Sequence, residues 1–252
     1  MSDVAGLSIL VTGGGSGIGR AVAVWLSARG ARVTISGRRV EALQAVTEET
    51  GCAAVAGDVT DPEGRRRMVE AAVAAGGGRL DGLVNNAGVM LRAPIEDLDE
   101  AAVLRAFHTN VVGAMMLTGL AAPELARTRG SVVFMGSAHT RRAFPGASPY
   151  AATKGAIQTL TQVLAAELGD RGVRVNCVVP GGVLTEINVR AGVMDADAAA
   201  ERHRAMGAMQ AIDRLGEGRH VAQAVEHLLC AEWTTGAILD VDGGLGLGVT
   251  RG

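Results

Sequence analysis

Residues 8–19 read S-I-L-V-T-G-G-G-S-G-I-G, and this stretch decides the fold. Ser8–Thr12 is a short, mostly apolar run of the kind that forms a buried strand. A glycine-rich turn follows it at once, and helical periodicity of apolar residues begins at Arg20. Glycines let a backbone approach phosphate groups closely, and a helix N-terminus offers unpaired N–H groups to them. The sequence therefore predicts a strand–turn–helix unit that binds a pyrophosphate.

Strand patterns and helix patterns alternate along the rest of the chain. Further strands are predicted at 32–36, 52–56, 81–85, 131–135, 174–178 and 237–241, and helices at 40–50, 61–75, 99–127, 149–170 and 219–230. This alternation predicts an α/β fold, a Rossmann-type doubly wound parallel β-sheet of about seven strands with helices on both faces. No linker interrupts the pattern, so we expect residues 1–252 to form a single NAD(P)-binding domain. The segment at about 186–212 has no strand signal and is predicted to be a substrate lid.

Composition excludes several classes of partner. The 252 residues carry a net charge of −2 with both signs interspersed, which does not favour a nucleic acid or a membrane surface. No apolar run approaches the length of a membrane span. Cys52, Cys177 and Cys230 are far apart and odd in number, which fits neither a disulfide framework nor a metal site. We therefore expect a cytoplasmic protein without a metal.

Tyr150 is the only tyrosine of the chain, and Lys154 is the only lysine. Residues four apart lie on one face of a helix, so the phenol and the ammonium are expected to share a small volume. A neighbouring ammonium favours the phenolate, and we therefore expect Lys154 to lower the pKa of Tyr150 and to make it a general acid and base near neutrality. The alternative is a helix with an interfacial tyrosine and a solvated lysine.

Polar residues follow the predicted strands. Arg38 and Arg39 follow the second strand, where an acidic residue binds the ribose 2′-hydroxyl of NAD and an arginine suits the 2′-phosphate of NADP. The pair favours NADP(H); if the two arginines only face solvent, NAD(H) is the alternative. Asp58 follows the third strand, at the sheet edge where ligands of parallel sheets bind.

Two polar features fall inside predicted helices. Asn110 lies within 99–127, although asparagine is unfavourable in a helix interior because its amide competes for backbone hydrogen bonds. The arginines at 65–67 are consecutive and fan around the helix 61–75, so we expect them to form a solvated surface.

The ordered set of motifs resembles the short-chain dehydrogenase/reductase family over essentially the whole chain, in particular its 3-oxoacyl reductase-like members. The pattern T-G-x-x-x-G-x-G is met at 12–19, N-N-A-G at 85–88 and P-G-x-x-x-T at 180–185. The family's catalytic asparagine matches Asn110, and its serine matches Ser137, thirteen residues before Tyr150. Tyr150 and Lys154 match the pair Y-x-x-x-K.

The resemblance implies roles for these residues. Tyr150 would exchange a proton with the substrate oxygen, which Ser137 would orient. Lys154 would hold the nicotinamide ribose, and Asn110 would support a water that leads protons to solvent. The implied cofactor-binding residues are Thr12, Gly13, Ser16, Gly17, Ile18, Gly19, Arg38, Arg39, Asp58, Val59, Asn86, Ala87, Gly88, Tyr150, Lys154, Pro180, Gly181, Val183 and Thr185.

The implied reaction is hydride transfer between a nicotinamide cofactor and a ketone or secondary alcohol. The candidate substrate contacts are Ser137, His139, Phe144 and Tyr150. An NAD-dependent alcohol dehydrogenase of the same family, an epimerase or dehydratase, and a catalytically silent dinucleotide-sensing module are the alternatives. Many NADP-preferring relatives carry a basic residue inside the glycine turn, where this chain has Gly15 and Ser16.

The family usually assembles through helices equivalent to 99–127 and 149–170. The resemblance therefore implies a homotetramer or homodimer. A 3-oxoacyl thioester, a cyclic or terpenoid ketone and a sugar-like polyol all stay open as substrates.

Overall fold

A parallel sheet of seven strands forms the middle layer of the computed structural model, which describes residues 3–183, 201, 205 and 207–248. Its strand order is β3-β2-β1-β4-β5-β6-β7. The chain order reverses between β1 and β4, and in such sheets ligands bind at the reversal, outside the carboxyl ends of the strands. The strands are β1 (Ser8–Thr12), β2 (Arg32–Gly37), β3 (Ala53–Ala56), β4 (Gly82–Asn85), β5 (Ser131–Met135), β6 (Arg174–Pro180) and β7 (Ile238–Val241).

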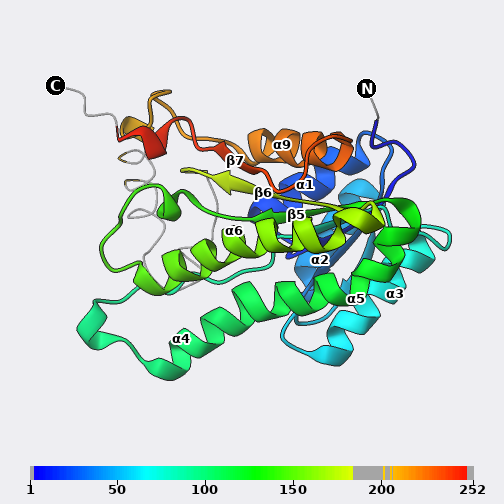
Figure 1. Ribbon diagram of the computed structural model, residues 1–252, viewed down its shortest axis with the longest axis horizontal. Coiled ribbons are helices and arrows are strands. Elements are labelled where there is room, and N and C mark those ends of the chain that lie inside the picture. Colours follow the sequence, from blue (N-terminus) through cyan, green and yellow to red (C-terminus); the bar gives the residue numbers. More distant parts are fainter. Residues whose placement is uncertain (1–2, 184–200, 202–204, 206, 249–252) are drawn as a thin grey trace.

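Helices cover both faces of the sheet (Figure 1). One layer packs Ile9, Leu26 and Val225 into a core between the sheet and helices α1, α2 and α9. The other layer packs Leu83 and Leu117 against helices α3, α5 and α6. The Rossmann-type arrangement expected from the sequence is thus confirmed. The long helices are α1 (Gly17–Ser27), α2 (Val40–Thr50), α3 (Pro62–Ala75), α4 (Glu100–Phe107), α5 (Gly113–Thr128), α6 (Ser148–Leu168) and α9 (Gly218–Cys230).

The helix predicted at 99–127 is divided by a π-helical turn, His108–Val112, between α4 and α5. Asn110 lies in this turn and is only 2% exposed. Its amide makes two hydrogen bonds to the backbone of Val89: Nδ2 donates to the carbonyl at 2.9 Å, and Oδ1 accepts the N–H at 2.8 Å. The side chain of Asn110, although unfavourable inside a helix, therefore holds the loop that follows β4.

The arginine triplet at 65–67 is not wholly solvated, so the expectation of a solvated surface is wrong at Arg65. Its side chain is buried, and its Nη1 donates to the carbonyl of Val59 at 2.7 Å. Arg66 is exposed and pairs with Glu63. The difference arises because the first arginine of α3 faces the end of β3, which only the packed chain brings there.

Part of the predicted lid lies outside the described residues. Of 186–212, only 201, 205 and 207–212 are among the described residues, and Thr185 also lies outside them. Across the described ranges, no helix combines the length and the apolar character needed to cross a membrane.

Candidate active site

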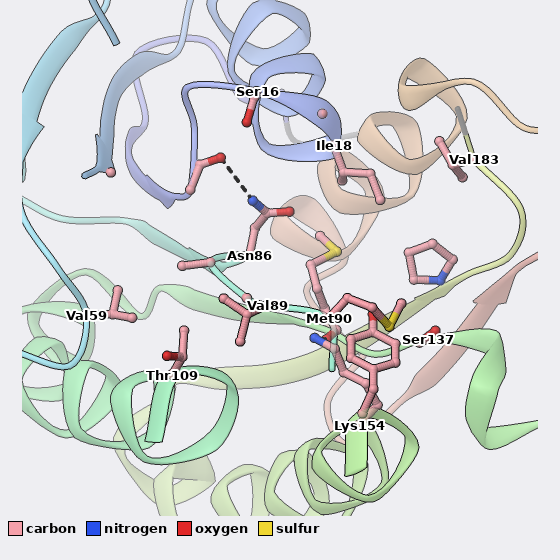
Figure 2. A pocket seen from close by; sticks show the side chains of 18 of the residues that line it. Ser16, Ile18, Val59, Asn86, Val89, Met90, Thr109, Ser137, Lys154 and Val183 are labelled. Atoms are coloured by element: carbon pink, nitrogen blue, oxygen red, sulfur yellow. Dashed lines mark hydrogen bonds between the residues drawn. The ribbon is translucent and has the colours of Figure 1, made fainter. Parts of the chain in front are cut away.

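A cavity of about 550 Å³ lies along the carboxyl ends of the strands. It begins at the ends of β2 and β3, passes the glycine turn, and ends at α6 and the turn after β5 (Figure 2). Residues predicted from distant parts of the sequence therefore share one wall. Those lining it are Gly13, Ser16, Gly17, Ile18, Arg38, Arg39, Asp58, Val59, Asn86, Ala87, Gly88, Ser137, His139, Phe144, Tyr150, Lys154, Pro180, Gly181 and Val183.

The glycine turn brings the backbone to the cavity surface. Gly13 and Gly17 have φ angles of +66° and +55°, in the left-handed region that side chains rarely adopt. A Cβ on Gly19 would collide with the carbonyl oxygen of Gly13 and with the amide nitrogen of Asn86. Gly19 thus lies behind the wall, and its lack of a side chain lets the turn close tightly.

Thr12 and Asn86 tie the turn to the neighbouring strand end. Oγ1 of Thr12 accepts the N–H groups of Asn86 and Ala87, both at 3.0 Å. Nδ2 of Asn86 donates to the carbonyls of Thr12 at 2.9 Å and of Gly13 at 3.3 Å. Thr12 is buried and braces the wall from behind, whereas Asn86 also lines the cavity.

Arg38 and Arg39 point to different neighbours at one end of the cavity. Nη1 of Arg38 lies 3.7 Å from Oδ2 of Asp58, at the end of β3. Nη2 of Arg39 donates to Oγ of Ser16 at 3.0 Å, across the glycine turn. Two cations therefore border the cavity beside the glycine turn.

Ser137, Tyr150 and Lys154 gather at the other end. Ser137 follows β5, while the other two residues lie on one face of α6, as the spacing predicts. All three are less than 9% exposed. Nζ of Lys154 lies 5.6 Å from the ring centroid of Tyr150 and donates to the carbonyl of Met135 at 2.8 Å.

Burial controls the pKa values of this cluster. Burial raises the pKa of Tyr150, and the hydrogen bond with Ser137 offsets part of the rise. The lowered pKa of Tyr150 that the sequence predicts is therefore not found in this geometry, because loss of solvation outweighs the hydrogen bond that favours the phenolate. Burial also lowers the pKa of Lys154 from 10.5 to about 8.

Asn110 lies behind the cavity wall. Besides holding Val89, its Nδ2 donates to Oγ1 of Thr153 at 3.1 Å. Thr153 in turn donates to the backbone carbonyl of Tyr150 at 2.7 Å. Asn110 thus links the loop after β4 to the helix that carries the tyrosine and the lysine.

The sequence did not point to several lining residues, of which Leu245 is the clearest. It comes from the C-terminal turn and is fully buried. Asp242 shapes this turn by accepting the N–H groups of Gly244 and Gly246, both at 2.8 Å. An Asp-Gly-Gly sequence is a turn signal, but its place beside the site depends on the sheet order. Arg92 and Thr109 are further lining residues of this kind.

These features fit an extended dinucleotide. Gly13, Gly15 and Gly17 line the cavity with backbone alone, which would let a phosphate group approach the turn closely. The arginines border one end, and the buried hydroxyl, phenol and ammonium lie at the other. Within the described ranges, no three His, Cys, Asp or Glu side chains are grouped so that they could hold a metal ion.

Comparison with known proteins agrees with this geometry. The model of the short chain dehydrogenase family matches residues 8–195. A 2,5-dichloro-2,5-cyclohexadiene-1,4-diol dehydrogenase of Sphingobium indicum is 37% identical, over 97% of this chain and 98% of its own. A glucose 1-dehydrogenase of Gluconobacter oxydans is 34% identical, over 96% of this chain and 93% of its own.

A solved structure of a short-chain type dehydrogenase/reductase from Mycobacterium ulcerans superposes with a TM-score of 0.88 at 34% identity, covering 98% of this chain and 92% of that one. The strand order, the motifs and these matches agree over nearly the full chain. The chain therefore belongs to the short chain dehydrogenase family, and it is an NAD(P)-dependent oxidoreductase that acts on alcohol and carbonyl groups.

Proposed function

We propose that the protein transfers a hydride between NADP(H) and a ketone or secondary alcohol, with Tyr150 as the general acid and base. The observation that carries this proposal is the buried cluster of Ser137, Tyr150 and Lys154 at the end of a cavity that begins at Arg38 and Arg39. We assign residues 1–252 to a single domain. For the other residues named as cofactor-binding, Thr185 included, we propose the roles that the resemblance to the family implies.

A bound nicotinamide supplies or accepts the hydride at the substrate carbon, and the proton steps fall to the chain. In reduction, the Tyr150 hydroxyl gives its proton to the substrate oxygen, which Ser137 also hydrogen-bonds. In oxidation, the phenolate takes the proton back. The ammonium of Lys154 favours that phenolate electrostatically and would hydrogen-bond a hydroxyl of the nicotinamide ribose.

The wall near Tyr150 favours a compact substrate with apolar surface. Met90, Phe144 and Leu245 line it, and His139 adds a polar group. The two named relatives are a glucose 1-dehydrogenase and a dehydrogenase of a cyclohexadiene diol. We therefore propose a ring-borne secondary alcohol or its ketone as the substrate class, and cyclohexanol and cyclohexanone as the first probes.

The direction of the reaction should respond to pH. Because the pKa of Tyr150 is raised, its phenolate is scarce at neutral pH, and kcat/KM for cyclohexanol oxidation should rise by about tenfold per pH unit from pH ~7 to pH ~9. Reduction needs the protonated phenol and should stay level up to about pH 7, above which Lys154 begins to lose its charge, half of it by about pH 8. Initial rates across the range, with circular dichroism as a control for folding, test this. A level oxidation profile would contradict Tyr150 as the base.

Cofactor preference should depend on the arginine pair. We expect NADPH to bind more tightly than NADH, and Arg38→Ala to erase the difference by weakening NADPH about 10- to 100-fold, since hydrogen bonds to charged groups contribute roughly 1.5–3 kcal/mol. Arg39→Ala should have a smaller effect in the same direction. Fluorescence titration of each variant with both cofactors measures the ratio.

Arg66→Ala provides the matched control, because Arg66 is an exposed arginine that pairs with Glu63 outside the cavity. An unchanged ratio in both cavity variants would assign the arginines to solvent, and tighter binding of NADH by the unsubstituted protein would make NAD(H) the cofactor. Tight binding of NADPH with no turnover of any alcohol or ketone would favour the dinucleotide-sensing module.

We also propose that the chain forms a homodimer or homotetramer in the cytoplasm. The π-helical turn and α5 expose Val112, Met115, Met116 and Leu120, and α6 exposes Val163. These helices are the ones through which the family usually assembles. Buried thiols such as Cys52 and Cys177 are typical of a reducing compartment.

A further inference from the structure

His139 lies against two residues of the proposed catalytic set. It stands two positions after Ser137, in a short 3₁₀ turn, Ala138–Thr140, and it lines the cavity. Its Nδ1 is 3.0 Å from Oγ of Ser137, and its backbone N–H donates to the same oxygen at 3.3 Å. Its ring meets the ring of Tyr150 edge-on, with centroids 5.2 Å apart and an interplanar angle of 88°.

We propose that His139 is a positioning residue for Ser137: its Nδ1–H donates to the serine oxygen, so that the serine hydroxyl proton is directed to the reacting oxygen of the substrate. This inference rests on the proposed function, in which Ser137 hydrogen-bonds the reacting oxygen. It goes beyond a substrate contact, since His139 would act through the serine.

The hydrogen-bonding capacity of the hydroxyl carries the argument. A serine hydroxyl has one proton and two lone pairs, and the backbone N–H of His139 already uses one lone pair. If Nδ1 carries no proton, it receives the hydroxyl proton, and Ser137 can only accept on its substrate side. That arrangement suits neither direction of the reaction, because the ketone oxygen only accepts and the single proton of the alcohol goes to the phenolate of Tyr150.

If Nδ1 carries the proton, it donates to the second lone pair, and the hydroxyl proton is directed elsewhere. Ser137 can then donate to a ketone oxygen, which only accepts. The alcohol oxygen likewise offers Ser137 a lone pair once its proton faces Tyr150, so both directions need the proton on Nδ1 of His139. An imidazole can adopt that tautomer, because either ring nitrogen can carry the proton.

Packing keeps the imidazole in place for this role. The ring of Phe144 also packs against it, with centroids 4.6 Å apart. Thr140 in the same turn donates to the carbonyl of Ser137 at 2.8 Å and accepts a hydrogen bond from Gln158 of α6. The turn, the serine and the helix of Tyr150 are thus held together as one unit. Only the position of the proton on the imidazole of His139 can then change.

Two substitutions separate the hydrogen bond from the ring packing. His139→Asn places an amide where Nδ1 stood and removes the ring, whereas His139→Phe keeps a ring and removes Nδ1. We expect His139→Asn to keep kcat for cyclohexanone reduction with NADPH within about 3-fold of the unsubstituted protein. His139→Phe should lower kcat by roughly 10- to 100-fold, as expected for loss of a positioned hydrogen bond, with an unchanged Kd for NADPH.

A double-mutant cycle tests the route through the serine. In a Ser137→Ala background, His139→Phe should cost less than about 2-fold, because the group on which it acts is gone. Equal losses in both histidine variants, or losses that multiply with that of Ser137→Ala, would assign the ring to packing alone and overturn the proposal.

A spectroscopic measurement needs no turnover. The side-chain nitrogen signals of His139, identified in nitrogen-15 spectra by their loss in His139→Asn, should shift in Ser137→Ala, and unchanged signals would overturn the proposal even if cyclohexanone is not reduced. Tyr150→Phe, run in parallel, reports on the proposed function separately. If it keeps full turnover, the acid–base assignment fails whatever the histidine variants do.

Discussion

Tyr150→Phe is expected to lower kcat for both directions of the reaction by about 10²- to 10⁴-fold, the usual contribution of a positioned general acid or base. The substitution removes only the hydroxyl that exchanges a proton with the substrate oxygen. The phenyl ring fills the same buried volume and keeps its contact with the ring of His139. Steady-state kinetics with cyclohexanone and NADPH, and with cyclohexanol and NADP⁺, measure the loss.

Binding of NADPH provides the internal control for this variant. The hydroxyl of Tyr150 lies at the end of the cavity opposite Arg38 and Arg39, so the Kd for NADPH should change little. Turnover near that of the unsubstituted protein would eliminate Tyr150 as the proton donor. A parallel loss of NADPH binding would instead show that the substitution disturbs the cavity.

Lys154→Met is expected to change activity and stability in opposite directions. It removes the ammonium beside Tyr150, so turnover should fall at least about 10²-fold. It also removes a charge from a site that is only 5% exposed. Burial lowers the pKa of this lysine from 10.5 to about 8, which corresponds to roughly 3 kcal/mol against the charged form in the folded state.

The hydrogen bond from Nζ to the carbonyl of Met135 would be lost as well, which costs about 1 kcal/mol. The free energy of unfolding should therefore rise by about 2 kcal/mol at pH 7, and Tm by several degrees for a chain of this size. Thermal unfolding followed by circular dichroism, together with kinetics on the same sample, tests both halves of the prediction.

The pH dependence of the stability gain shows whether it comes from removal of the buried charge or from packing of the methionine. A lysine with a lowered pKa in the folded state destabilises the protein fully below pH 8, and the penalty disappears as pH rises from about 8 to 10.5. The advantage of Lys154→Met should therefore shrink near pH ~10. A gain that persists there would come from packing of the methionine, and a less stable variant at pH 7 would contradict the burial cost.

The features that depend only on neighbouring residues could be predicted from the sequence. A short apolar strand, a glycine turn and a helix follow one another at 8–29, and the structure has the same three elements there. The four-residue spacing of Tyr150 and Lys154 places both on one helix face in any right-handed helix. Alternation of strands and helices then restricts the fold to a doubly wound sheet, because parallel strands need crossover connections.

The groups that lose contact with water and the distant segments that meet could be identified only from the tertiary structure. Burial raises the pKa of Tyr150, whereas the sequence predicted a lowered pKa. Packing of the chain also places Arg65 and Asn110 inside the protein, where both side chains donate hydrogen bonds. The sheet order brings Leu245 from the C-terminal turn into the cavity. The physical reason is that solvation and long-range contacts depend on the packing of the whole chain, whereas strand, turn and helix patterns are properties of neighbouring residues.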